Sequence, residues 1–116
     1  MWLLTPIGFF SIVRKPEDVE AGMLTVRARV RSDLQQLKQH LLPELGPIVE
    51  GRGTDYRYRA RAPKQAVALA MVRLVEQLDY SNFKDAVAQR QGKPRARLYH
   101  DVWDVLYGLQ SDPPAV

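Results

Sequence analysis

Alternating apolar and polar residues predict the β-strands of this 116-residue chain. Residues 23–31 (MLTVRARVR) and 55–61 (DYRYRAR) alternate with a period of two, which is typical of a strand with one buried face. Residues 8–14 (GFFSIVR) are aromatic and β-branched and predict a third strand, followed by a loop at residues 15–18. Residues 48–50, before the glycine-rich segment 51–53, predict a short edge strand and a hairpin turn. About four strands are therefore expected.

Apolar residues at helical spacing predict four helices in the remaining segments. A capping-box pattern, S-x-x-Q, begins the first at Ser32, and Pro63 suits the first turn of the second. Ser81 is the expected cap of a third helix. The last helix is expected to begin near Arg97 and to end at Gly108.

The order of these elements predicts an α+β fold, with helices packed on one face of an antiparallel sheet. Short connections favour a ferredoxin-like arrangement or a permuted variant of it. The length is that of one domain. We therefore expect a single domain over residues 1–110 and a flexible C-terminal tail over residues 111–116.

The amino-acid composition limits the kinds of site and partner that the chain can have. The chain has no cysteine, so disulfides, thiolate nucleophiles and zinc-thiolate sites are excluded, and no cofactor is expected. Its N-terminal segment lacks a basic leader, and no apolar run is long enough to cross a bilayer, so no membrane association and a cytoplasmic location are expected. The net charge of +4 comes from twelve arginines among the seventeen basic residues. This bias indicates an anionic partner, although high-GC codon usage would also produce it.

Arginine occupies every second position of the two clearest strands. Alternate side chains of a strand share a face, so each strand is expected to present three guanidinium groups on one side of the sheet. Six like charges on one surface need a counter-charge. The predicted anion-binding residues are Arg27, Arg29, Arg31, Arg57, Arg59 and Arg61.

An exposed sheet face with arginine and aromatic side chains is typical of surfaces that bind RNA or single-stranded DNA. Phe9 or Phe10, with Tyr80, are the candidate stacking residues. Two structural alternatives remain open: a solvated arginine face, or neutralisation of the arginines by helix carboxylates such as Asp101 and Asp104.

A second hypothesis is a protein-interaction module. The row Tyr99, Trp103 and Tyr107 together with Phe83 predicts an aromatic patch that suits a protein interface or a homodimer, and the arginines would equally suit an acidic protein surface. No catalytic residues are recognised. His100 with Asp101 or Asp104 would need a pocket that the sequence does not reveal, and two histidines do not make a metal site.

Four segments together resemble a family of small uncharacterised bacterial proteins. They are MWLLT with GFFSIV at the start, DYRYR in the middle, DYSNFK, and Tyr99-x-x-Val102-Trp103 in the last helix. The resemblance covers nearly the whole chain and implies a bacterial cytoplasmic protein. It implies no reaction, ligand or partner.

Overall fold

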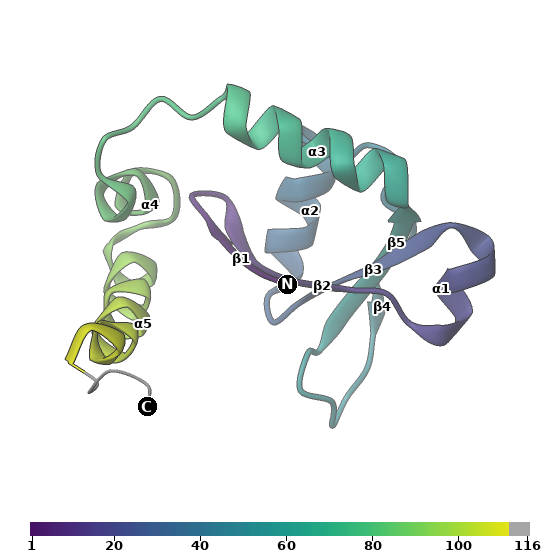
Figure 1. Cartoon of the computed structure of the whole chain (residues 1–116), viewed down its shortest axis with the longest axis horizontal. Helices are drawn as coiled ribbons and strands as arrows, with labels where there is room; N and C mark the ends of the chain where they lie inside the picture. The colour runs from purple at the N-terminus through teal and green to yellow at the C-terminus, as the bar shows by residue number, and fades with distance from the viewer. Residues whose placement is uncertain (112–116) are drawn as a thin grey trace. The chain divides into compact units, whose positions relative to one another are not determined.

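The structure, a computed structural model, describes residues 1–111, which form five strands and five helices in the order β1-β2-α1-β3-α2-β4-β5-α3-α4-α5 (Figure 1). All neighbouring strands are antiparallel, and their order in the sheet is β1-β2-β3-β5-β4. The α+β class is thereby confirmed. The strands are β1 (Trp2–Thr5), β2 (Gly8–Val13), β3 (Met23–Ala28), β4 (Val49–Glu50) and β5 (Tyr58–Pro63). The helices are α1 (Pro16–Ala21), α2 (Arg31–His40), α3 (Lys64–Glu76), α4 (Phe83–Gln91) and α5 (Lys93–Ser111).

The sheet has one strand more than the sequence predicted, because residues 2–5 form the edge strand β1. A two-residue turn, Pro6-Ile7, joins β1 to β2. The Thr5 hydroxyl stabilises this turn: it accepts hydrogen bonds from the N–H groups of Ile7 and Gly8 and donates one to the carbonyl of Gly8. The ferredoxin-like arrangement stays a prediction.

Contacts between residues divide the chain into two compact units. The first unit, Met1–Asp79, contains the sheet with α1, α2 and α3, and the second begins at Tyr80 and contains α4 and α5. A single domain over residues 1–110 stays a prediction beside this division. Of the predicted tail, Ser111 ends α5, and residues 112–116 lie outside the described part.

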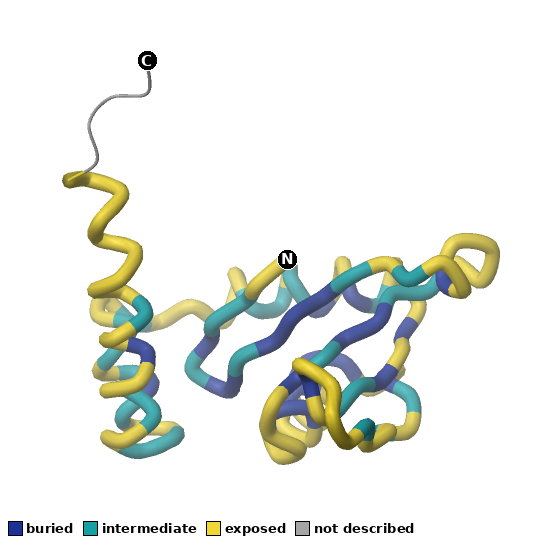
Figure 2. Tube along the Cα trace, turned by 90° about the horizontal axis from the view of Figure 1, so that it is seen from below, coloured by how far each residue is buried: buried dark blue, intermediate teal, exposed yellow. Residues whose placement is uncertain are grey.

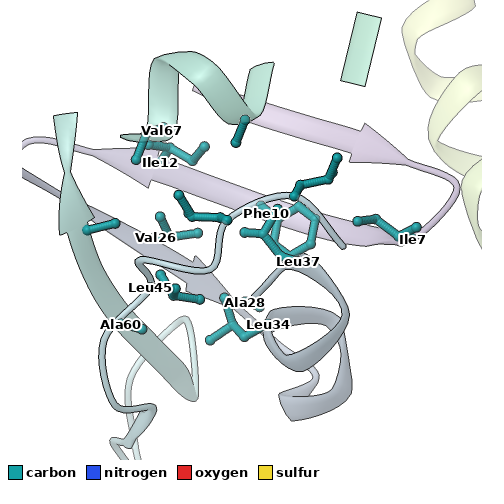
Figure 3. Packing of buried hydrophobic residues seen from close by; sticks show 14 residues of the cluster. Ile7, Phe10, Ile12, Val26, Ala28, Leu34, Leu37, Leu45, Ala60 and Val67 are labelled. Carbon is teal, nitrogen blue, oxygen red and sulfur yellow. The ribbon is translucent and has the colours of Figure 1, made fainter. Parts of the chain in front are cut away.

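The core of the first unit lies between one face of the sheet and the helices α2 and α3. Phe10, Val26 and Leu34 are fully buried there, and Figure 3 shows them among the other buried apolar side chains. In Figure 2 the buried parts of the trace follow the central strands. The remaining members of the cluster are Ile7, Ile12, Ala28, Leu37, Leu41, Leu42, Leu45, Ala60, Ala62, Val67 and Ala70.

Several predicted boundaries in the first unit are wrong: β5 begins at Tyr58 rather than Asp55, and Pro63 ends β5 and caps α3 instead of lying in its first turn. Strand β3 ends at Ala28 rather than Arg31, because the backbone bends at residues 29–30 and α2 already begins at Arg31. Val30 is consequently the residue before α2, and Ser32 makes no cap. The segment expected to be a loop contains the short helix α1, which Pro16 begins with a preset φ.

The helices of the second unit also begin earlier or later than predicted. Asn82, and not Ser81, caps α4, since its side chain accepts a hydrogen bond from the N–H of Asp85 at 2.9 Å. Helix α5 begins at Lys93 and passes through Gly108 without ending there. It reaches Ser111, which makes it the longest helix described.

Candidate functional site

A row of directly paired residues crosses the sheet on the face opposite α2 and α3, which we call the open face. Cross-strand partners point to the same side of an antiparallel sheet. Trp2 pairs with Ser11, Ser11 with Arg27, and Arg27 with Arg59. Arg59 in turn pairs with the exposed Val49 of β4, so the row brings five side chains, one from each strand, onto one surface.

Arg27 and Arg59 are the charged centre of this row. Among residues 1–111 neither forms a salt bridge. Arg27 donates from Nη2 to the Ser11 hydroxyl at 2.7 Å, and Arg59 donates from Nη2 to the Tyr56 carbonyl at 3.2 Å. The Nε atoms of both arginines are buried without a hydrogen-bond partner. Two like charges thus stand side by side with only neutral acceptors.

Aromatic rings surround these cations. The guanidinium carbons of Arg27 and Arg29 lie 4.4 Å and 4.7 Å from the centre of the Tyr56 ring. Phe9 lies beside this group, with its ring centre 6.4 Å from that of Tyr56. Cation–π attraction and the buried tyrosine ring hold the arginines in place, but they supply no negative charge.

Arg61 stands apart from the row because α1 neutralises it at one end of the open face. Its Nε and Nη2 lie 2.8 Å and 2.7 Å from Oδ1 of the fully buried Asp18. The other carboxylate oxygen accepts from the Thr25 hydroxyl and the Lys15 N–H. Burial alone would raise the pKa of Asp18, but hydrogen bonds from Thr25, Lys15 and Arg61 hold that pKa below its ordinary value of 3.8.

Arg31 and Arg57 do not join the open face. Both guanidinium groups lie over the ring of Tyr58, at 5.4 Å and 5.5 Å, and Tyr58 packs against the core on the other side of the sheet. Arg57 also forms a salt bridge of 2.6 Å with Glu50, and this hydrogen-bonded carboxylate raises the pKa of Arg57. The alternating pattern fails for these two arginines because both lie outside the regular strands.

The predicted stacking residues have three different environments. Phe10 is fully buried in the core, so it is unavailable to a ligand. Phe9 is half-buried on the open face, where Arg29 lies 5.9 Å from its ring centre. Tyr80 belongs to the second unit and contacts Phe83 there, with ring centres 6.1 Å apart.

The aromatic residues predicted as an interaction patch divide into two groups within the second unit. Tyr99 is buried and stacks on Phe83 at 5.9 Å, so this pair joins α4 to α5. Trp103 and Tyr107 contact each other at 5.4 Å and are about half exposed. His100 stacks on Trp103 and lies 2.9 Å from the amine of Lys84, and neither Asp101 nor Asp104 forms a salt bridge within the described residues.

Sequence reasoning missed two aromatic residues of the open face. Trp2 was overlooked because its strand has only four residues, although the Thr5-to-Gly8 turn would have placed it opposite Ser11. Alternation along residues 55–61 would place Tyr56 on the core face, opposite the arginines. Regular strand geometry begins only at Tyr58, and before it the chain turns the Tyr56 ring toward Arg27.

No helix in the described part of the chain is long and apolar enough to span a membrane. Residues 1–111 also contain no cluster of three or more histidine and carboxylate side chains arranged to hold a metal ion. Comparison with known protein families, with curated proteins and with solved structures finds no match. The family resemblance inferred from the sequence therefore stays a prediction.

Proposed function

We propose that this chain is a non-enzymatic polyanion-binding domain that holds the phosphates of RNA or single-stranded DNA on the open face of its sheet. The proposal depends on one observation: Arg27 and Arg59 lie directly opposite each other on neighbouring strands. Neither forms a salt bridge with a carboxylate of the described residues. Like charges in this position are destabilising. A phosphate placed between them would replace repulsion by two charge-assisted hydrogen-bonding contacts.

The chemistry of the surface favours nucleic acid over an acidic protein. Arginine forks match phosphate oxygens, and the same face carries exposed Trp2 and half-exposed Phe9. Aromatic rings beside arginines are the combination that binds single-stranded nucleic acid, since the bases stack on the rings while the phosphates contact the arginines. An acidic protein surface would offer carboxylates to the arginines but no bases to stack on the rings.

Binding to a fluorescent single-stranded oligonucleotide across a salt series tests the proposal. We expect affinity to fall as salt rises, with a slope of about −0.7 for each phosphate contact. The double variant Arg27→Gln/Arg59→Gln should bind about tenfold more weakly at low salt and lose about 1.4 from the slope. Fluorescence anisotropy measures both quantities.

A charge-matched control distinguishes a specific effect of the arginine row on binding from a general effect of net charge. Arg52→Gln/Arg90→Gln removes the same two charges from exposed positions outside the open face, and we expect it to keep most of the affinity and the slope. Equal losses in the two double variants, or an affinity indifferent to salt, would contradict the proposal. Circular dichroism of both variants confirms that they are folded.

A second candidate function, protein interaction or homodimerisation, is favoured by the apolar stripe of α5. Leu98, Val105 and Leu109 are each more than half exposed, and they follow the coiled-coil spacing together with Val102. Figure 2 shows that the C-terminal half of α5 is exposed. An apolar face of this kind is typical of an interface between chains.

Sedimentation equilibrium tests this second function. We expect a concentration-dependent dimer for the natural sequence, and a monomer for Leu98→Glu/Val105→Glu, because two buried charges would not be tolerated in a helix seam. His100→Glu/Ser111→Glu adds two glutamates on the opposite side of α5 and should still dimerise. A natural chain that stays monomeric at high concentration rules out homodimerisation through this stripe.

A further inference from the structure

We propose that Trp2 is a base-stacking platform, so that the open face selects single-stranded nucleic acid with unpaired bases. This inference rests on the proposed function and deepens it. Arginine–phosphate contacts alone give the edge strand β1 no role, whereas base stacking on Trp2 gives it one. Trp2 is 65% exposed, the greatest exposure of any aromatic side chain in the described chain.

The position of Trp2 fits this role because it ends the same cross-strand row as the two arginines. Trp2 pairs with Ser11, which pairs with Arg27. With neighbouring strands about 4.8 Å apart, the backbone of Trp2 lies about 10 Å from Arg27 and about 15 Å from Arg59. A short run of nucleotides would therefore reach from the arginine pair to the indole ring along one surface.

The orientation of the indole is also held. Its ring meets the Phe9 ring edge-to-face, with centres 5.6 Å apart and planes at 85°. Phe9 in turn contacts Tyr56 and lies under Arg29. An aromatic pair of this geometry is favourable in itself, so Phe9 supports the indole from one side while most of its surface stays accessible.

Stacking requires a base whose face is free, and this requirement identifies the ligand. In a duplex the base faces are occupied by neighbouring pairs, whereas a single strand offers them. Base–aromatic stacking is tolerant of sequence, because every base has a π-face. The geometry thus fits single-stranded RNA or DNA bound with little sequence preference.

The experiment compares three probes of about six nucleotides: a single strand of thymidines, an abasic strand with the same phosphates, and a duplex. We expect the thymidine strand to bind about tenfold more tightly than the abasic strand, and Trp2→Ala to abolish this ratio. Trp2→Phe should restore part of it. Trp103→Ala removes the chain's other tryptophan, which lies in the second unit, and should leave the ratio unchanged.

Fluorescence gives an independent readout. In a Trp103→Phe background Trp2 is the sole tryptophan, and we expect its emission to be quenched by the thymidine strand but not by the abasic strand. A ribose version of the probe compares RNA with DNA. Circular dichroism of Trp2→Ala checks that the loss is not a folding defect.

The outcomes distinguish this inference from the function on which it rests. Equal, salt-dependent binding of thymidine and abasic strands overturns the stacking role and leaves the phosphate-binding function intact. A duplex that binds as tightly as the thymidine strand overturns it as well. Absence of salt-dependent binding to every probe overturns both.

Discussion

Replacing Gly8 by alanine should destabilise the first unit by about 2–3 kcal/mol, because no space exists for a methyl group there. A Cβ at this position would lie 2.7 Å from both Cβ and Cγ of Asp33, and 2.9 Å from Cζ of Phe10. The Asp33 side chain is not free to move aside. Its Oδ2 accepts the N–H of Phe9 at 3.0 Å, and this hydrogen bond links α2 to β2.

Urea unfolding followed by circular dichroism measures the effect of Gly8→Ala. Gly51→Ala is the matched control in the same unit, since a Cβ there meets only Thr54 atoms, at 3.6 Å, which is ordinary contact. We expect the control to unfold within about 0.5 kcal/mol of the natural sequence. Equal stability of Gly8→Ala and Gly51→Ala would contradict the prediction, because it would show that α2 can shift away from β2 without loss of free energy.

Asp18→Asn should cost a comparable amount, about 2–3 kcal/mol. The fully buried Asp18 carboxylate accepts hydrogen bonds from Thr25, Lys15 and Arg61, and an amide would offer an N–H₂ group to donors that need an acceptor. Loss of one partner from a buried pair is strongly destabilising. Partial exposure of the Arg61 side chain, 43%, keeps the expected cost at the lower end.

The pH dependence of this variant follows from the lowered pKa of Asp18. A carboxyl group whose pKa is lower in the folded state stabilises the fold above its unfolded pKa of about 3.8, and loses this contribution as the pH falls through the folded value. The difference in unfolding free energy between the natural sequence and Asp18→Asn should therefore be greatest near neutral pH and shrink below pH 3.8. Glu20→Gln, an exposed change in the same helix, is the control and should unfold within about 0.5 kcal/mol of the natural sequence at neutral pH.

The fold was predictable where a strand is regular and its two faces differ. Strand β3 has Val26 and Ala28 facing the core and Arg27 facing away, so its period of two is visible in the sequence. Strand β1 has no such alternation, because Leu3 and Leu4 are both apolar and both half-buried. Its existence depends on pairing with β2, which is a contact between segments and not a local pattern.

The candidate site was predictable only in part for the same reason. Arg27 and Arg59 lie within regular strands, and alternation placed them on one face correctly. Arg31 is the first residue of a helix and Arg57 precedes its strand. Alternation in the sequence therefore does not predict which face of the sheet these two side chains occupy. The neutralisation of Arg61 depends on Asp18, 43 residues away in sequence.

Under the proposed function, anion binding at the Arg27–Arg59 pair would also be coupled to thermal stability. Two buried Nε atoms without acceptors and two adjacent cations destabilise the sheet. Any anion that binds the folded form alone shifts the unfolding equilibrium toward that form. Under the proposed function we therefore expect the lowest melting temperature in buffer free of anions, and a thermal-shift screen of phosphate-bearing compounds would rank ligands by how far each raises that temperature.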